Sequence, residues 1–114
     1  MYKLMLLTIF GLLVNVFTYA EETSNQSTGL VSLLSVENWV SSEMLYIHAS
    51  DNTAVNPAGC TITDRYVLPK EASTFSRSMV IAAYAAGHTL SFTIYNGSCI
   101  NERPQVVSVK FESY

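Results

Sequence analysis

The sequence predicts a mainly β (α+β) fold with short antiparallel strands, one helix and one disulfide. Runs of alternating apolar and polar residues lie on both sides of a helix-patterned stretch at about residues 71–86. The only two cysteines, Cys60 and Cys99, flank this stretch. Three strands before the helix and two after it give the order β-β-β-α-β-β, which suits a small five-stranded barrel like the oligonucleotide- or oligosaccharide-binding (OB) fold. An open α+β sandwich uses the same elements and is the alternative.

The first 20 residues have the pattern of a cleaved export signal. Lys3 gives a positive start, residues 4–17 are almost wholly apolar, and Ala20 ends a site of the kind that signal peptidase cuts. The apolar run is shorter than the ~20 residues that a helix needs to cross a bilayer. We therefore expect a signal peptide at 1–20, a flexible polar leader at 21–29 and a single β-rich domain at 30–114, secreted or periplasmic.

Three strands are expected before the helix, at residues 30–36, 43–49 and 60–68. The first alternates imperfectly, which indicates either a bulge or burial on both faces. The second places Leu45, Ile47 and Ala49 on one face. The third ends at Pro69, because proline cannot donate a hydrogen bond to a sheet.

The helix is predicted by apolar residues spaced four, three and four apart, in a stripe formed by Phe75, Met79, Ala82 and Ala86 and widened by Ala72 and Ala83. Ser73 or Thr74 can cap its start. Gly87 stands where a helix commonly ends in the left-handed conformation. The stripe should therefore face the sheet.

Two strands are expected after the helix, at residues 89–95 and 105–112. The first alternates strictly and should turn Leu90, Phe92 and Ile94 inward. Asn96-Gly97 then predicts a turn, because both residue types tolerate positive φ. In the last strand the residues on one face are Val107, Val109 and Phe111.

The cysteine pair predicts a structural disulfide. Export places Cys60 and Cys99 where a disulfide forms and persists, and one pair allows one connectivity. The bridge would join the two ends of a strand-helix-strand unit. On the chain-entropy model its closure contributes roughly 4 kcal/mol to stability.

The charge balance argues against polyanionic partners. Without Lys3 the mature chain has five basic and nine acidic residues and no basic run. Phosphate-backbone binding depends on clustered Lys and Arg. We therefore expect neither nucleic acid nor an anionic membrane surface as a partner, and no stable membrane insertion once the signal is removed.

No catalytic or metal-binding pattern is present, so we expect no enzyme, no metal and no cofactor. His48 and His88 lack a partner at a metal-ligand spacing. The serines lie in no nucleophile motif, and no glycine-rich phosphate loop occurs. Asp64 and Arg65, in the middle of a predicted strand, need a partner or a wet face, either within the sheet or across a subunit boundary.

The aromatic residues are the candidates for binding. Trp39 falls in the expected turn at 37–42, and Tyr46, His48 and Tyr95 fall on the outer faces of strands. Such side chains combine a flat apolar body with a polar tip, which suits sugars or a protein partner. The alternative is that Trp39 caps the core and the tyrosines form ordinary cross-strand pairs.

The chain resembles small exported bacterial proteins with one disulfide, most of them uncharacterised. The likeness is carried by Asn56-Pro57-Ala58-Gly59-Cys60, by Asp64-Arg65-Tyr66-Val67-Leu68-Pro69, by Ala82-Ala83-Tyr84-Ala85-Ala86-Gly87 and by Cys99. The order of elements is also similar to that of the B subunits of subtilase- and pertussis-like toxins. That resemblance implies a ring-shaped homo-oligomer that binds glycans, and it transfers no individual binding residue.

The sequence thus predicts a secreted or periplasmic, non-enzymatic binding domain. Its partner would be a glycan or a protein, in the manner of a toxin B subunit. The alternative is a monomeric periplasmic inhibitor or accessory protein of an envelope enzyme.

Overall fold

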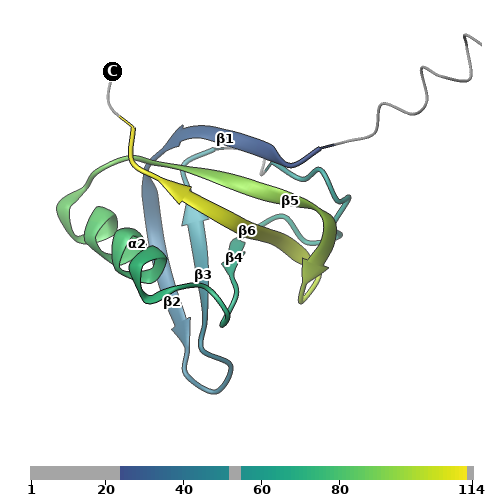
Figure 1. Ribbon diagram of the computed structural model, residues 1–114, viewed down its shortest axis with the longest axis horizontal. Coiled ribbons are helices and arrows are strands. Elements are labelled where there is room, and N and C mark those ends of the chain that lie inside the picture. Colours follow the sequence, from purple (N-terminus) through teal and green to yellow (C-terminus); the bar gives the residue numbers. More distant parts are fainter. Residues whose placement is uncertain (1–23, 52–54, 113–114) are drawn as a thin grey trace, which may run out of the picture.

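The computed structural model describes residues 24–51 and 55–112, and the expected signal peptide lies outside them. Its strands form one open sheet in the order β1-β5-β6-β4-β3-β2 (Figure 1). The elements are β1 (Gln26–Val31), β2 (Leu33–Trp39), β3 (Met44–Ala49), β4 (Tyr66–Leu68), helix α2 (Thr74–Ala86), β5 (Leu90–Ile100) and β6 (Arg103–Lys110). The prediction of a mainly β fold with a helix and a disulfide is confirmed. The prediction of a five-stranded antiparallel barrel is wrong, because the sheet has six strands, is open, and pairs β4 with β6 in parallel.

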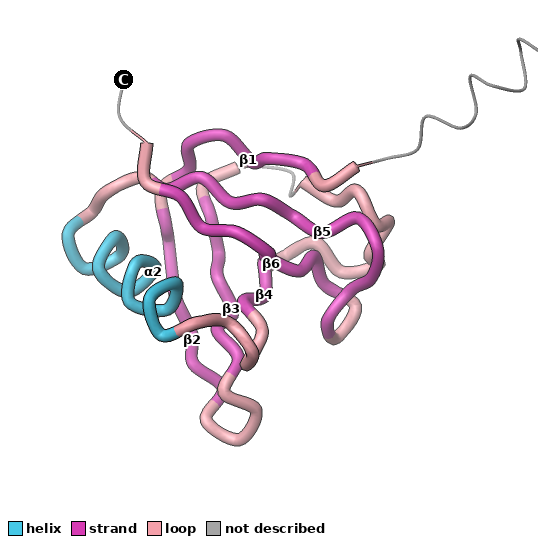
Figure 2. Tube along the Cα trace, viewed as in Figure 1, coloured by secondary structure: helices cyan, strands magenta, loops and turns pink. Residues whose placement is uncertain are grey.

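The two edges of the sheet belong to one bent segment. β1 pairs with β5, the chain turns sharply at Ser32, and β2 pairs with β3 (Figure 2). The imperfect alternation at 30–36 reflects this bend together with a register shift between Leu33 and Ser35. Residues 26–29, which we expected in a flexible leader, belong to β1, where the Thr28 hydroxyl accepts a hydrogen bond from Phe92 N (3.1 Å).

β4 is much shorter than the predicted strand at 60–68. Only Tyr66–Leu68 pair with β3, and the parallel pairing with β6 consists of Val67 and Gln105. Residues 60–65 instead run without regular pairing toward the end of β5, where the disulfide holds them. Helix α2 contacts β2 and β6 on either side of this short strand.

The predicted caps of helix α2 are confirmed, but the helix begins at Thr74 and not at about residue 71, and of the predicted buried face only Ala83 is fully buried. The Ser73 hydroxyl accepts a hydrogen bond from Ser76 N (3.1 Å), and Gly87 has φ 71°. Val80 and Ala83 face the core, whereas Phe75 is 75% exposed. The buried face is displaced by about one residue from the predicted stripe. Alanines lie on several sides of the helix, so the apolar pattern does not define a single face. Within the described residues, no helix is long and apolar enough to cross a membrane.

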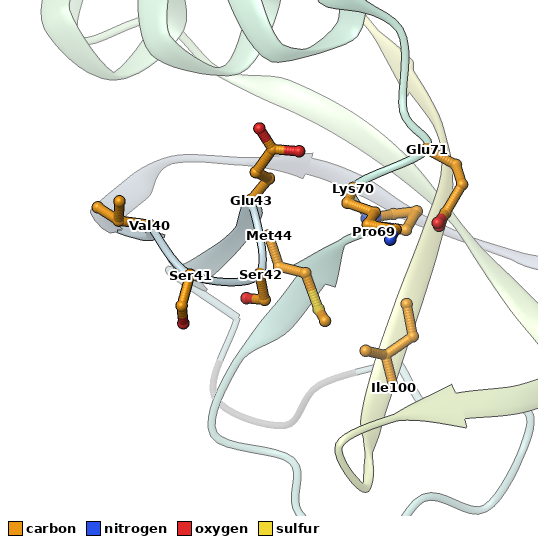
Figure 3. A pocket seen from close by; sticks show the side chains of 9 residues that line it. All are labelled: Val40, Ser41, Ser42, Glu43, Met44, Pro69, Lys70, Glu71 and Ile100. Atoms are coloured by element: carbon orange, nitrogen blue, oxygen red, sulfur yellow. The ribbon is translucent and has the colours of Figure 1, made fainter.

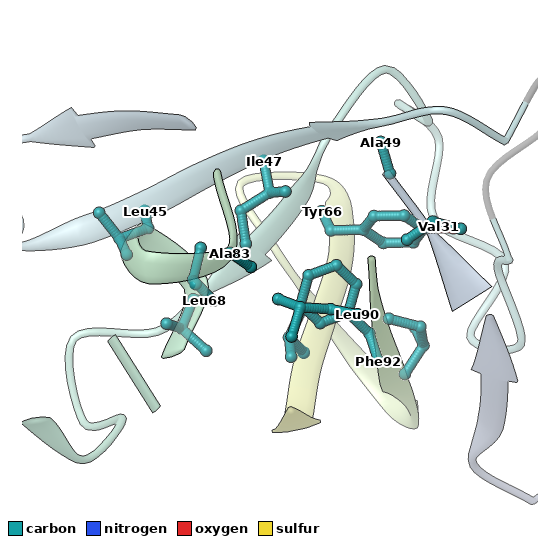
Figure 4. Close-up of a cluster of buried hydrophobic side chains, with 12 residues drawn as sticks. Val31, Leu45, Ile47, Ala49, Tyr66, Leu68, Ala83, Leu90 and Phe92 are labelled. Atoms are coloured by element: carbon teal, nitrogen blue, oxygen red, sulfur yellow. The ribbon is translucent and has the colours of Figure 1, made fainter. Parts of the chain in front are cut away.

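The core lies between the strands and helix α2 (Figure 4). The predicted inward faces of β3 and β5 are confirmed, since the buried residues include Leu45, Ile47, Ala49, Leu90, Phe92 and Ile94. In β6 the inward residue is Val106 rather than Val107. Thr93 pairs with Ser108 but Ile94 pairs with Val106, so Val107 is an extra residue that reverses the alternation.

The predicted turn at Asn96-Gly97 is wrong, because β5 continues through both residues to Ile100. A side chain at Gly97 would lie 2.4 Å from the Tyr95 ring, so this glycine makes room for the tyrosine. The β5–β6 turn consists of Asn101 and Glu102, which both have positive φ (47° and 65°), between the paired residues Ile100 and Arg103. That geometry is typical of a two-residue hairpin turn.

We expect Tyr66→Phe to destabilise the domain by about 1–3 kcal/mol, measured by chemical denaturation. The Tyr66 hydroxyl donates to Asp51 Oδ2 and accepts from Val55 N (2.8 Å), and it is buried. Tyr84→Phe is the matched control, because Tyr84 is half-exposed on α2. Equal stabilities of the two variants would contradict a structural role for the Tyr66 hydroxyl.

Burial raises the pKa of Tyr66 well above its ordinary value, and the hydrogen bond to Asp51 acts in the same direction. The neutral hydroxyl therefore stabilises the fold fully below the unfolded-state pKa of about 10, and this stability is lost as the pH rises above it. We expect wild-type stability to fall more steeply than that of Tyr66→Phe across this range in denaturation series. Parallel curves would contradict this assignment.

Candidate functional site

A hollow of about 410 Å³ brings together residues from distant parts of the chain. We call it the Trp39 site. It is lined by Glu37, Trp39, Ser41, Ser42, Tyr46, Asp64, Arg65, Asn101 and Arg103. The β2–β3 turn and the β5–β6 turn border it, and both project from the lower side of the molecule in Figure 1.

Trp39 and Tyr46 form the aromatic part of the site. Glu37 pairs with Tyr46 across β2 and β3, so Trp39, two residues further along β2, lies on the same face. The Trp39 and Tyr46 ring centroids are 5.3 Å apart with the planes tilted by 33°. Trp39 Nε1 donates to Glu37 Oε1 (3.1 Å), which fixes the indole. The indole is 49% exposed while Tyr46 is 6% exposed, so Trp39 presents the aromatic surface to solvent.

Arg103 also contacts Tyr46. Its guanidinium carbon is 5.3 Å from the centre of the Tyr46 ring, which is a cation–π distance. Arg103 Nε donates to Asp64 Oδ1 (2.8 Å), and Arg103 Nη1 donates to the Asn101 carbonyl (3.2 Å). Asn101 Nδ2 donates to the Tyr46 hydroxyl (2.6 Å). Trp39, Tyr46, Arg103 and Asp64 are therefore linked in turn by an aromatic contact, a cation–π contact and a hydrogen-bonded ion pair.

The opposite charges of Asp64 and Arg103 stabilise each other. The hydrogen bond from Arg103 holds the pKa of Asp64 below its ordinary value; the positive charges of Arg103 and Arg65 add to this effect, and partial burial opposes it. The same hydrogen bond raises the pKa of Arg103. Arg65 Nη1 lies 3.9 Å from Asp64 Oδ2, so this second ion pair is looser. Asp64 is thus an anion fixed by Arg103, which makes it an acceptor and not a proton donor.

Both turns beside the site contain non-glycine residues with positive φ. Among the described residues these positions are Glu43 (59°), Asn101 (47°) and Glu102 (65°). At Asn101 and Glu102, positive φ is the geometry that a two-residue hairpin turn requires. Hydrogen bonds hold both turns, from Glu43 N to Trp39 O (2.7 Å) and from Ile62 N to Glu102 O (2.9 Å).

The predicted disulfide is confirmed, and it supports the site directly. Cys60 and Cys99 have a Cα separation of 5.8 Å. The bridge holds residues 60–65 against the β5–β6 turn, where the Thr61 hydroxyl also donates to Glu102 Oε1 (3.2 Å). The Asn56 side chain binds both the N–H and the carbonyl of Cys60 (2.7 and 2.8 Å). These restraints bring Asp64 to Arg103.

The structure brings together two of the four predicted binding residues. Trp39 ends β2 and does not lie in the expected turn, and it contacts Tyr46. His48 lines a neighbouring hollow of about 240 Å³ with Asp51 and Thr63. Tyr95 packs over Gly97 on β5 and does not line the Trp39 site.

The sequence pattern does not identify Arg103 and Asn101 as residues of the site. Arg103 is 39 positions from Asp64, and Asn101 is 55 positions from Tyr46, so no local spacing connects them. The one available signal was the charge of Asp64 and Arg65 in a strand-like stretch, which indicated a missing partner. Arg103 is that partner for Asp64.

A larger hollow, of about 490 Å³, is lined in part by the β2–β3 turn and shares Ser41 and Ser42 with the Trp39 site (Figure 3). Val40, Met44 and Ile100 line it together with charged residues of the β2–β3 and β4–α2 connections. It has neither an aromatic surface nor a polar network. We therefore regard the Trp39 site as the candidate, although it is smaller.

The described residues contain no group of three or more His, Cys, Asp or Glu side chains that could hold a metal ion. The chemistry that the Trp39 site offers is stacking on an indole and hydrogen bonding to carboxylate, guanidinium, hydroxyl and amide groups.

Comparisons of the chain with protein-family models, with curated proteins and with solved structures found no match.

We expect the double variant Cys60→Ser, Cys99→Ser to lose about 2–5 kcal/mol of stability in chemical denaturation. It should also raise the pKa of Asp64, because residues 60–65 are no longer held against Arg103. Thr61→Ala is the control that removes only the hydrogen bond to Glu102, and it should cost much less. Alkylation of the wild type without reductant should leave its mass unchanged, whereas alkylated thiols would overturn the bridge.

We expect Arg103→Gln to raise the pKa of Asp64 toward its ordinary value, followed by NMR titration of the carboxyl carbon. Because the pKa is lowered in the fold, the pair stabilises the protein above the unfolded-state pKa of about 3.9 and loses this contribution as the pH falls below it. Arg65→Gln should give a smaller rise and Lys110→Gln none, since Lys110 pairs with Glu112. An equal rise in Arg65→Gln would show that Arg103 is not the main partner.

Proposed function

We propose that the protein is an exported, non-enzymatic binding module that binds a glycan at the Trp39 site. The observation that carries this proposal is the half-exposed Trp39 indole, fixed by Glu37 and supported by Tyr46 and Arg103. An aromatic surface that is already rigid loses little conformational entropy when a ligand stacks on it. The polar groups around it supply directional hydrogen bonds at its rim.

The environment of the titratable groups supports binding over catalysis. Asp64 is held as an anion by Arg103, so it is a poor general acid. His48 and His88 do not line the Trp39 site. Arg103 is engaged by Asp64, Tyr46 and Asn101 and holds the site together.

The disulfide is compatible with the export that the N-terminal pattern predicts, since such bridges persist outside the reducing cytosol. A ring-shaped homo-oligomer, implied by the resemblance to toxin B subunits, remains part of the proposal. Its test is the mass in solution at micromolar concentration. A monomeric mass would exclude the ring and would not affect the proposed binding site.

A second candidate is a monomeric accessory protein or inhibitor that binds an envelope enzyme. The observation that favours it is the exposure of three large apolar side chains on helix α2, Phe75, Ile81 and Tyr84. The one charged residue of this helix, Arg77, donates to the Pro69 carbonyl (3.0 Å). Ile81 and Tyr84 lie within one turn of each other, and exposed apolar side chains of this kind favour a protein partner.

We expect Trp39→Ala to weaken glycan binding by at least about tenfold, because it removes the stacking surface. The measurement is a glycan array followed by titration calorimetry with the best ligand. Tyr84→Ala is the matched control, an equally exposed aromatic residue on α2, and should bind like the wild type. Unchanged binding by Trp39→Ala, or a loss in Tyr84→Ala alone, would move the binding surface away from Trp39.

A further inference from the structure

We propose that the ligand of the Trp39 site is an uncharged hexopyranoside, held by stacking of one sugar face on Trp39 and by hydrogen bonds to neighbouring hydroxyls. The inference rests on the proposed function and names the class of glycan. It excludes ligands that are recognised mainly through a carboxylate, such as uronic and sialic acids.

The formal charges that line the site balance. Glu37 and Asp64 are acidic, and Arg65 and Arg103 are basic. Arg103 and Asp64 compensate each other at 2.8 Å. The remaining charges are Glu37 and Arg65, one of each sign, so the site presents no excess charge to a ligand. A charged ligand of either sign therefore loses hydration that the site does not offset.

The exposed parts of Arg65 and Asp64 offer a ligand a hydrogen-bond donor beside an acceptor. The Arg65 side chain is 32% exposed and its Nη1 donates to the Asp64 carbonyl (3.2 Å). The Asp64 side chain is 50% exposed beside it, with acceptor positions beyond those used by Arg103. In a carboxylate–guanidinium pair, the carboxylate accepts from one hydroxyl and the guanidinium donates to its neighbour. Adjacent hydroxyls on a pyranose ring provide this pair.

The aromatic surface fits the other face of such a ring. A hexopyranose has one face of C–H groups, which is apolar, and hydroxyls at its edge. Trp39 offers an exposed indole whose orientation is fixed by the bond to Glu37, and the exposed Ser41 lies at the rim. The hollow of about 410 Å³ falls in the lower part of the range typical of small-molecule sites, about 300–1,000 Å³.

The chain carries its own reporter for the test, because Trp39 is its only tryptophan. The mature protein is screened on an array of neutral and acidic glycans. Methyl hexopyranosides representing the terminal sugars of the strongest neutral ligands, with the matching hexuronic acids, are then titrated while Trp39 emission is recorded. We expect a saturable change with the neutral sugar and binding at least about tenfold weaker with the acid, which differs only at C6. We also expect little change in neutral-sugar affinity between low and high salt, since screening acts on charges.

Arg65→Gln separates hydrogen bonding from charge. Gln keeps a neutral donor, so we expect the affinity for the neutral sugar to fall by no more than about threefold. Lys110→Gln is the control for the change in net charge, because it lies outside the site. A loss of tenfold or more in Arg65→Gln alone, together with strong salt dependence, would overturn the inference.

The outcomes distinguish the inference from the proposed function. Binding that requires sialic or uronic acid, changes Trp39 emission and is lost in Trp39→Ala would overturn the neutral class and leave the glycan-binding function standing. If the array shows no binding, or shows only binding that Trp39→Ala does not remove, both the inference and the proposed function are overturned. Neutral binding with a Trp39 response supports both.

Discussion

The disulfide between Cys60 and Cys99 is the constraint on which the rest of the structure depends. Residues 60–65 have no regular pairing that would hold them, yet they supply Asp64 and Arg65. The bridge and the hydrogen bond from Ile62 to Glu102 hold this segment against the β5–β6 turn. The bridge therefore connects the core strand β5 to the loop that completes the charged half of the Trp39 site.

The fold was predictable where local pattern and final environment agree. The alternation of β5 and the capping residues Ser73 and Gly87 of α2 specified their elements correctly. The pattern failed at Val107, where one extra residue in a bulge changes which residues of β6 face the core. It failed also in the alanine-rich helix, whose buried face depends on contact with β2 and β6 and not on its own sequence. The sixth strand and the parallel pairing arise from contacts between distant segments, which local pattern does not encode.

The candidate site was predictable in its aromatic half only. Trp39 and Tyr46 are close in sequence and lie on paired strands, so a hairpin reading brings them to one face. Arg103 and Asn101 join them through a turn whose residues, Asn101 and Glu102, do not resemble a favoured two-residue turn as clearly as Asn96-Gly97 does. The stronger local signal marked instead the place where Tyr95 packs over glycine. A turn signal thus identified a packing requirement, and the true turn is stabilised by tertiary contacts.

The pairing of β1 with β5 also determines when the sheet can be completed during folding. Gln26 pairs with Ile94, and Ser27 pairs with Thr93, so the first described strand finds its partner more than 60 positions later. Contacts this distant in sequence make folding slow, because closing the long intervening loop costs entropy before the contacts stabilise the chain. β1 therefore has no strand to pair with until the chain as far as β5 is available. One edge of the sheet is completed only when most of the domain is present.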